Sequence, residues 1–577
     1  MPSAEGNMRE GAASEQHATA ALLPAADRPQ LHPWGPHERR ALIGRLRDTP
    51  SAWDLVVVGA GITGAGIARD AALRGLRVLV LEAADVAFGT SSRSTRLVHG
   101  GVRYLEQGEL GLVYEALRER ARLYQSAPHL VHATRFLFPA YRGDRLGPWK
   151  LRLGLTLYDT LNFHRGEPHE YLGAEATRLA EPLLAEAGLR GAVAYEDAVT
   201  DDARLTLAIV LDARRAGAEV LTYAKVTRID QAAGAAVASA RHRVVLDDGT
   251  VVPAHAVVVA AGPWTSPALL GRPADGLLTL SKGTHVVMRA DDVPVRQPLV
   301  LQVPGERRIL FVVPWGARTY LGTTDAAYEG DPGRSGVTRA DEREILELVA
   351  RVLPTARLGH ERIVSAWSGV RPLVRAAGTT STAELSRKHR IVERDDGVLA
   401  IVGGKLTTYR AMAEELVDVV IERLQPQPAA SRRAPCTTDH TPLVPGEPLD
   451  AIELEDPLLA DLVGRHGPLA RPIAARADAA AATRLVPDLP YRWCEVDHAI
   501  AFEGAVHAID IVRRRLPLVL TDAQQGAAVI LAVATRLVDA FGGGQSDIDD
   551  EVDRFRAEVA TETGRTPPVI PTTTRPT

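Results

Sequence analysis

The sequence predicts an α/β fold in three parts: a discontinuous domain around a parallel sheet, an antiparallel β-rich domain and a C-terminal all-α domain. Three observations lead to this prediction. Residues 54–82 pass from an apolar run through a glycine-rich turn and a helical pattern to a second apolar run. Residues 280–325 alternate apolar and polar side chains, as antiparallel strands with one buried face do. Residues 450–562 carry a helical pattern throughout.

The first of these segments has the order strand, glycine turn, helix, strand and acid that is typical of a Rossmann-like dinucleotide-binding unit. Gly59 permits the tight turn, Gly61 lets the backbone approach a pyrophosphate, and Gly64 lets the helix pack close to the strand. The helix N-terminus offers N–H groups and a partial positive charge to the phosphates. Glu82 ends the second strand, where it can hydrogen-bond a ribose hydroxyl.

Further strands of the same sheet are expected in three later segments. They are residues 218–230, 243–262 and 397–415. The second segment ends in Ala261 and Gly262, a turn of small residues that allows a ligand to approach the backbone closely. This domain is therefore expected to be assembled from pieces that lie far apart in the chain.

Composition and charge exclude several classes of protein. The chain has 577 residues, enough for two to four domains, and a net charge of −5, which argues against nucleic-acid binding. Its two cysteines, Cys436 and Cys494, form no CxxC pair. We therefore expect no disulfide scaffold, zinc ribbon or iron–sulfur cluster, and no metal site.

The ends of the chain are expected to stay outside the folded domains. Residues 1–50 are interpreted as a mostly disordered extension with a short charged helix over 37–47, and residues 564–577 as a disordered tail. The sequence shows no secretory signal and no apolar run of transmembrane length. These features predict a cytoplasmic location.

A loop rich in hydroxyl groups follows the acidic strand end and is the second strong motif. Residues 89–105 read GTSSRSTRLVHGGVRYL and combine Thr90, Ser91 and Ser92 with three arginines and a His-Gly-Gly sequence. Hydroxyls and N–H groups at this density suit a phosphate or another polar ligand.

At this point the sequence resembles a known family, the FAD-dependent glycerol-3-phosphate dehydrogenases. The similarity spans about residues 51–427 and rests on collinear motifs. They are GAGITGAGIARDAALRG, GTSSRSTRLVHGGVRYLEQGELGLV, DDARLTL, AAGPWTSPAL, KGTHVVM, LGTTDAAYEGDP, WSGVRPLV and GGKLTTYRAMAEE. A weaker match, EVDHAIAFEGAVHAIDIVRRR, continues into the helical part.

The resemblance implies FAD as cofactor and a matching set of domains. An FAD-binding domain over 51–430 would be interleaved with a substrate domain, mainly 140–190 and 266–365, and followed by a C-terminal helical domain over 443–563. The glycine turn and Glu82 would bind the ADP half of FAD. Other cofactor contacts implied are Thr90, Ser91, Ser92, His99, Gly100, Gly101, Ala261, Gly262, Gly403, Gly404, Lys405, Leu406 and Thr407.

The implied substrate is glycerol 3-phosphate, whose dianionic phosphate asks for cationic side chains. The candidates are Arg103, Arg371 and Lys405, with Tyr104 as a further contact. His285 is the first candidate for the base that removes the C2 hydroxyl proton, and His99 is the second. Alternatively, Arg371 or Lys405 stabilises a developing alkoxide and no discrete base is needed.

Several alternatives remain open at this stage. The electron acceptor is quinone or another oxidant, and the chain is a monomer or a homodimer. Residues 147–165 fit either an amphipathic helix on a membrane surface, which would place the protein on the inner face of the cell membrane, or a helix facing the core. An amine- or amino-acid-oxidising flavoprotein and a non-catalytic FAD-binding sensor are the competing functions.

Overall fold

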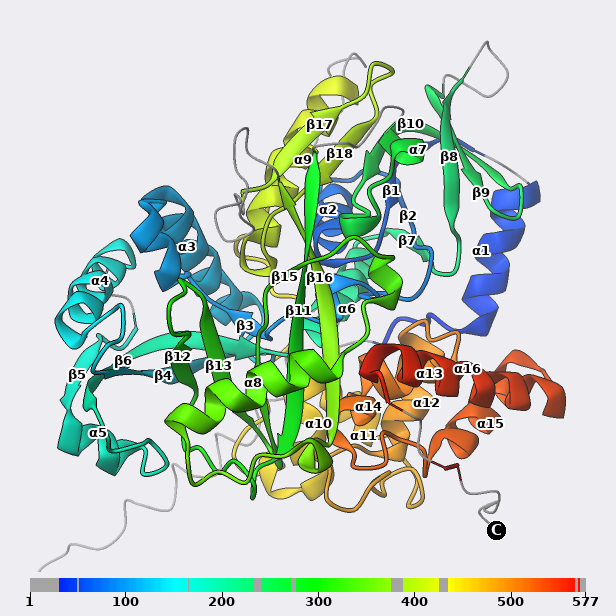
Figure 1. Ribbon diagram of the computed structural model, residues 1–577. Helices are drawn as coiled ribbons and strands as arrows, with labels where there is room; N and C mark the ends of the chain where they lie inside the picture. Colours follow the sequence, from blue (N-terminus) through cyan, green and yellow to red (C-terminus); the bar gives the residue numbers. More distant parts are fainter. Residues whose placement is uncertain are drawn as a thin grey trace, which may run out of the picture.

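The computed structural model describes residues 31–48, 51–163, 166–232, 240–270, 277–374, 388–424, 434–565 and 569–570. Within them the chain forms two sheets and a C-terminal group of helices, in agreement with the predicted fold class (Figure 1). Residues 1–30 and 571–577, for which the sequence predicts disorder, lie outside the described residues.

The first sheet contains the parallel core of the molecule. Its strands are β1 (Trp53–Val58), β2 (Val78–Leu81), β7 (Glu219–Leu221), β8 (Val226–Gln231), β9 (His242–Leu246), β10 (Val251–Val259), β17 (Arg390–Glu393) and β18 (Leu399–Val402). The order is β17-β18-β10-β1-β2-β7, with β9 and β8 continuing from β10. Leu55 of β1 is in register with Val78 of β2 and Ala256 of β10, in parallel pairs on both sides. Because both faces are covered, these strands are near-continuous apolar runs.

Alternate side chains of β1 point to different layers. Leu55 and Val57 pack with three helices, α2 (Ile62–Leu73), α6 (Asp202–Arg215) and α9 (Tyr409–Leu424). Val56 and Val58 pack on the other face, against helix α1 (Pro36–Asp48) and the β8–β9 hairpin. Helix α1 covers the region where the sequence predicts a short charged helix. The dinucleotide-type β1–α2–β2 unit is thus the centre of the domain.

Residues 218–230 form two strands rather than the single strand that the sequence predicts. Strand β7 ends at Leu221, and Tyr223 adopts a φ of +52° before β8 begins. The N–H of Tyr223 donates to the carbonyl of Ala84, and its hydroxyl donates to Asp510 Oδ1 at 2.6 Å. These tertiary contacts turn the chain out of the parallel sheet, which strand propensity alone does not reveal.

The second sheet is mostly antiparallel. Its strands are β3 (Leu97–Val98), β4 (Val131–Tyr141), β5 (Glu170–Gly173), β6 (Leu189–Thr200), β11 (Leu278–Arg289), β12 (Leu299–Gln302), β13 (Ile309–Trp315), β14 (Arg318–Gly322), β15 (Ala326–Ala327) and β16 (Ser365–Val374). The order is β15-β11-β14-β13-β12-β4-β6-β3, with β16 on β11 and β5 on β6. The sheet therefore extends beyond 140–190 and 266–365, the ranges predicted for most of the substrate domain.

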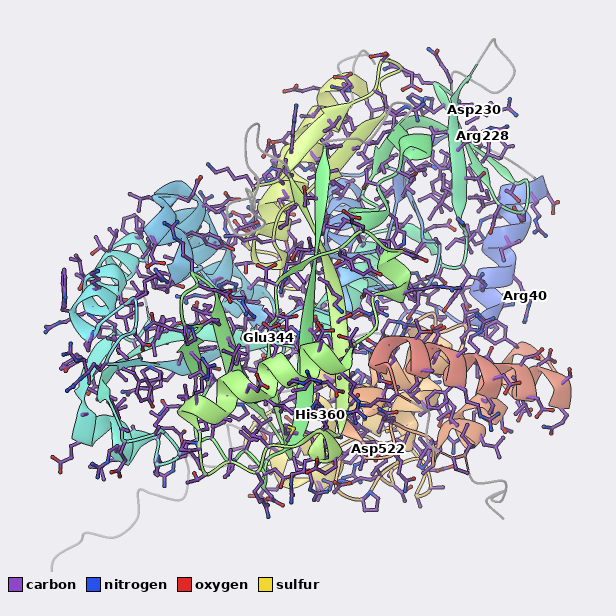
Figure 2. The ribbon with its side chains drawn as sticks, viewed as in Figure 1. Arg40, Arg228, Asp230, Glu344, His360 and Asp522 are labelled. Atoms are coloured by element: carbon purple, nitrogen blue, oxygen red, sulfur yellow. The ribbon has the colours of Figure 1, made fainter. Side chains whose placement is uncertain are left out.

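Four helices pack around this second sheet. They are α3 (Leu110–Ser126), α4 (Pro148–Leu161), α5 (Ala174–Ala180) and α8 (Arg339–Val352). The short helix α7 (Pro267–Leu270) packs instead against β8 of the first sheet. Helix α8 lies against β11 and begins with a capping box in which Thr338 and Asp341 satisfy each other's backbone N–H groups (Figure 1). Figure 2 shows Glu344 on this helix, and its carboxylate lies 2.6 Å from Arg308 Nη2 of the segment before β13.

The C-terminal part is helical and docks against both sheets. Its elements are α10 (Pro457–His466), α11 (Ala470–Ala474), α12 (Trp493–Phe502), α13 (Ala508–Asp510), a π-helical turn (Ile511–Arg515), α14 (Leu518–Thr521), α15 (Ile530–Phe541) and α16 (Gln545–Thr563). Arg514 and Arg515 of the π-helical turn both pair with the buried Asp85, which follows β2. Among the helices that the structure describes, none combines the length and the apolar character needed to cross a bilayer.

Candidate active site

A cavity of about 1000 Å³ lies between the carboxyl ends of the parallel strands and the second sheet. Its walls come from the β1–α2 turn, the end of β2, the loop after it, the turns after β10 and β18, and β16. A smaller chamber of about 160 Å³ adjoins it. Both spaces are lined by Thr95, Leu97, His99, Tyr104 and Arg371.

Two of the three glycines of the first turn, Gly59 and Gly64, occupy positions that exclude a side chain. Gly59 has a φ of +110°, and a Cβ there would lie 2.6 Å from the carbonyl oxygen of Ala260. A Cβ on Gly64 would lie 1.9 Å from the carbonyl oxygen of Gly59, so this glycine lets α2 approach the turn. Gly61 caps α2 and faces Ser91, whose Oγ accepts the Ile62 N–H at 2.9 Å. The α2 N-terminus therefore opens onto the cavity, as a phosphate site requires.

Glu82 lines the cavity at the end of β2. Its Oε2 accepts the N–H of Ala60 at 2.6 Å, and its Oε1 accepts the N–H of Ala84 at 2.9 Å. Desolvation raises the pKa of this carboxyl, although the backbone N–H groups act in the opposite direction. The two hydrogen bonds fix the carboxylate at the edge of the glycine turn.

The three hydroxyl residues predicted to bind the cofactor have different surroundings. Thr90 and Ser91 line the cavity, and the Thr90 hydroxyl donates to the carbonyl of Val370 at 2.6 Å. Ser92 is 1% exposed and lines neither cavity. These residues form a 3₁₀ turn (Thr90–Ser92), which directs the first two side chains toward the cavity and the third into the protein.

Two small-residue turns close the other end of the cavity. Gly262, Gly403 and Gly404 have φ values of +54°, +74° and +88°, which favour glycine. Lys405, Leu406 and Thr407 follow, and all three line the cavity together with Ala261. Since α9 begins directly after the 3₁₀ turn Leu406–Thr408, the positive end of this helix points toward the cavity.

The segment His99–Gly101 divides between the cavities and the interior. His99 lines both cavities, and its N–H donates to Thr407 Oγ1 at 3.2 Å. Gly101 lines only the chamber, and Gly100 lines neither space. The N–H of Gly100 instead donates to the Tyr158 hydroxyl at 2.9 Å and to Asp197 Oδ1 at 3.3 Å. Gly100 thus anchors the loop that presents His99.

Arg371 is the predicted phosphate ligand that the structure places at the junction of the two spaces. It extends from β16 across β11. Its Nη2 donates to Thr323 Oγ1 at 3.1 Å, and its Nη1 lies 3.7 Å from Asp325 Oδ1. Lys405 approaches the same region, with its ammonium 3.7 Å from the centre of the Tyr104 ring. The side chain of Arg103 lies outside the described residues, so its role stays a prediction.

His285 lies behind the cavity wall and lines neither space. It is 1% exposed, its Nε2 lies 3.1 Å from Thr95 Oγ1, and its ring stacks on Trp367 with centroids 4.7 Å apart. Desolvation, followed by the charges of Arg371 and Arg96, lowers its pKa well below the usual value. The imidazole is therefore neutral, and it reaches the cavity only through Thr95.

Sequence reasoning did not assign a role to two further cavity residues. Arg308 lines the chamber and donates from Nη1 to the carbonyl of Thr323 at 3.2 Å. Thr323 itself accepts from Arg371, so two guanidinium groups meet at one residue. The motif LGTTDAAYEGDP contains Thr323 and offered a signal, whereas Arg308 is one of several arginines in the chain and stands in no recognised motif.

Comparison with protein families gives two adjoining matches. Residues 54–419 match the model of FAD dependent oxidoreductases, and residues 402–547 match the C-terminal domain of alpha-glycerophosphate oxidase. The aerobic glycerol-3-phosphate dehydrogenase of Staphylococcus epidermidis is 38% identical over 384 residues, which are 66% of this chain and 68% of the relative. That of Staphylococcus haemolyticus is 38% identical over 402 residues, 68% and 71% of the two chains.

Solved structures extend the similarity to nearly the whole chain. The glycerol-3-phosphate dehydrogenase from Bacillus halodurans, complexed with FAD, has a TM-score of 0.73 and 28% identity. The match covers 92% of this chain and 98% of that one. The FAD-bound L-alpha-glycerophosphate oxidase from Mycoplasma pneumoniae shares the fold, with a TM-score of 0.54 and 17% identity over 67% of this chain and 99% of that one.

Proposed function

We infer the reaction of this chain from the family to which it belongs, the FAD-dependent glycerol-3-phosphate dehydrogenases. The chain binds FAD and oxidises sn-glycerol 3-phosphate to dihydroxyacetone phosphate. In this reaction the C2 hydrogen leaves as a hydride and the C2 hydroxyl loses a proton. The observation that carries the proposal is the junction of the two cavities, which Arg371, His99 and Tyr104 all line.

The residues of the larger cavity fit FAD at both ends. The α2 N-terminus and Ser91 suit the pyrophosphate, and the carboxylate of Glu82 stands where a ribose hydroxyl would be recognised. At the other end, the backbone from Gly403 to Leu406 lines the cavity where the positive end of α9 points toward it, which suits the flavin. Bound flavin supplies the hydride acceptor.

Arg371 and Arg308 are the groups that we assign to the substrate phosphate. Guanidinium groups bind phosphate oxygens in a planar fork, and these two converge on Thr323. Arg308 is already close to two carboxylates, Glu306 at 3.0 Å and Glu344 at 2.6 Å. Arg371 Nη1 lies 3.7 Å from Asp325 Oδ1, and its guanidinium stands at the junction of the two spaces.

We assign proton removal from the C2 hydroxyl to His99. This side chain lines both cavities and is held by the Gly100 anchor and by Thr407. Histidine is a common general base in enzymes that work at neutral pH. His285 acts as a positioning residue, because its Nε2 contacts the Thr95 hydroxyl and not the cavity.

A substrate panel tests the proposed reaction against its main rival. The enzyme is assayed with a soluble dye as acceptor, using glycerol 3-phosphate, glycerol, glycine, sarcosine and proline. We expect glycerol 3-phosphate to have the highest kcat/KM, and Arg371→Gln to lower it by about 100-fold, the loss of roughly 3 kcal/mol of charged hydrogen bonding. Faster oxidation of an amino acid would identify an amine-oxidising flavoprotein, and no turnover of any substrate would favour a sensor.

We also propose that the electron acceptor is a quinone that enters the apolar part of the smaller chamber after the product has left Arg308 and Arg371. Most of its wall is apolar, which suits a quinone ring better than a charged acceptor. The apolar lining residues include Leu151, Phe136, Phe138, Tyr195, Val300, Ile309 and Phe311. Helix α4 separates this chamber from the surface, with Leu151 and Gly154 on its inner side.

The outer side of α4 suits contact with a membrane surface. Trp149, Leu153 and Leu157 follow one another at helical spacing on one face and are 67%, 64% and 39% exposed. Phe163 is 65% exposed and extends this apolar face, with its ring 6.0 Å from that of Tyr114 on α3. Large exposed apolar side chains beside lysine and arginine are typical of helices that lie in a bilayer interface.

Vesicle binding and quinone reduction test this membrane proposal together. Leu153→Glu should reduce co-sedimentation with anionic phospholipid vesicles and reduction of a long-chain quinone dissolved in them, while activity with a soluble dye stays unchanged. Leu179→Glu is the matched control, because Leu179 is 73% exposed on α5 and lies off this face. Equal vesicle binding by wild type and Leu153→Glu would refute the proposal.

A further inference from the structure

A third cavity, of about 60 Å³, lies where the FAD domain, the C-terminal helices and the N-terminal segment meet. Its wall combines residues of α6, α10 and α12 with residues 31–32 and 443–445. It shares no lining residue with the two cavities of the active site. Figure 1 shows α6 between the parallel sheet and the C-terminal helices that complete this wall.

The wall of this cavity is rich in arginine. The four arginines are Arg204, Arg214, Arg215 and Arg465, and Asp212 is the one acidic residue among the lining residues. Three of the four have a carboxylate partner: Glu503 for Arg204, Asp212 for Arg215 and Glu495 for Arg465. Within the described part of the chain, Arg214 has no ion pair; it stacks on Trp34 at 4.7 Å and donates to the carbonyl of Pro33.

Two buried nitrogen atoms of this wall lack hydrogen-bond partners among the described residues. They are Nη1 of Arg214 and Nε2 of His129. A buried polar group without a partner costs about 1–3 kcal/mol, more when it is charged, so such groups are rare in folded proteins. Their presence on one small cavity indicates an occupant that accepts hydrogen bonds.

Three histidines around the cavity have lowered pKa values, caused by burial and by the nearby arginines. Burial lowers the pKa of His129 to about 3 and that of His466 to about 4, and in both the next cause is the charge of Arg204. The pKa of His32 is lowered in the same way, by burial and then by Arg215 and Arg214. Three of the four arginines are paired with a carboxylate, and Arg214 adds a further positive charge, which attracts an anion.

A metal ion does not fit the same place, even though His466, His498 and Glu503 could supply ligand atoms. The guanidinium of Arg204 already stands among them. Its Nη1 donates to Glu503 Oε1 at 2.8 Å, and its Nη2 lies 3.2 Å from His466 Nδ1. The arginine thus occupies the position that a metal would need.

We propose that this cavity binds a small oxyanion, either inorganic phosphate or the phosphoryl group of a small ester, through Arg214 and His129. The neutral His129 donates from Nε2, and Arg214 supplies the unpaired charge. Because the wall joins three separate parts of the chain, a bound anion links the C-terminal helices to the FAD domain. Its binding stabilises their association without entering the active site.

Thermal unfolding of the FAD-loaded enzyme tests this proposal, with inorganic phosphate as the probe and chloride to keep ionic strength constant. Phosphate at 100 times its Kd should raise the Tm by about 2 °C, as expected for ligand linkage in a chain of this size. Arg214→Gln should lose this rise and keep the wild-type kcat/KM measured without phosphate. Arg371→Gln should keep the rise, because its substitution affects only the active-site phosphate.

A matched control and a second measurement complete the test. Arg40→Gln, an exposed arginine of α1 at the edge of the molecule (Figure 2), should behave as wild type. If Arg214→Gln does not fold, equilibrium dialysis of Arg371→Gln should still find one phosphate per chain. An equal Tm rise in wild type and Arg214→Gln, no rise in wild type, or a rise abolished by Arg371→Gln would overturn the proposal.

Discussion

Adding one methyl group at Gly283 should displace Arg371 while leaving its charge intact. Gly283 on β11 pairs with Gly369 on β16, and the Arg371 side chain crosses β11 at this point. A Cβ on Gly283 would lie 2.3 Å from Arg371 Nη2, 2.6 Å from Nη1 and 2.6 Å from Thr323 Oγ1. Because Gly283 does not have a positive φ, the backbone itself accepts alanine.

The magnitude of the effect follows from these distances. Ordinary non-bonded contact requires about 3.5 Å, so the guanidinium must move by about 1.2 Å. A misplacement of about 1 Å in a substrate-positioning group costs up to about 100-fold in rate, or about 2.7 kcal/mol. Since the obstructed atoms are the end of a flexible side chain, the free energy of unfolding should change much less.

Steady-state kinetics with glycerol 3-phosphate, together with Tm and FAD content, measure this effect. We predict that Gly283→Ala lowers kcat/KM by about 100-fold, keeps FAD and changes Tm by only a few degrees. Gly173→Ala is the control, because a Cβ there meets no atom within 4 Å. A Gly283→Ala enzyme with wild-type kcat/KM would refute the assignment of Arg371 to substrate positioning.

Three further predictions concern the cofactor, the phosphate and the C-terminal helices. Gly64→Ala should abolish FAD retention, measured by absorbance after gel filtration, because its Cβ would lie 1.9 Å from the backbone oxygen of Gly59; full FAD content would contradict this. Arg308→Gln should raise KM for glycerol 3-phosphate by about tenfold with little change in kcat, because roughly 1.4 kcal/mol of uniform binding is lost; an unchanged KM would exclude this arginine. The carboxyl of Glu562 has a pKa lowered to about 2, despite burial, by Arg513 and Arg93. Its stabilisation is fully present above pH 4.5 and is lost as pH falls toward 2, about 3 kcal/mol in all. Urea unfolding of Glu562→Gln should therefore depend less on pH in this range than unfolding of wild type, and equal pH dependence would refute the assignment.

The sequence predicted those parts of the site that depend on backbone geometry. Gly59, Gly61 and Gly64 occupy the predicted turn because strand, turn and helix are adjacent in the chain and their spacing fixes the geometry. Arg371 was identified through its motif and lies at the junction of the two cavities, and its role in phosphate binding stays a proposal. Local sequence patterns of this kind are sufficient to predict the local backbone structure.

The parts that sequence did not predict depend on packing between distant segments. The sequence correctly places His285 on strand β11. Its imidazole lies behind the cavity wall because the loop that carries Thr95 packs in front of it, and this packing cannot be read from the sequence. Arg308 reaches the chamber because β13 and β14 pair, which no local pattern reveals. Helix α4 has a buried face, which fits the core-facing interpretation of residues 147–165, and an exposed apolar face, on which the membrane proposal rests.

The most direct test of the proposed reaction is the visible spectrum of the purified protein under anaerobic conditions. We predict a flavin band near ~450 nm that bleaches when glycerol 3-phosphate is added, with one dihydroxyacetone phosphate formed per FAD. A band that persists with glycerol 3-phosphate but bleaches with an amino acid would contradict the proposed reaction.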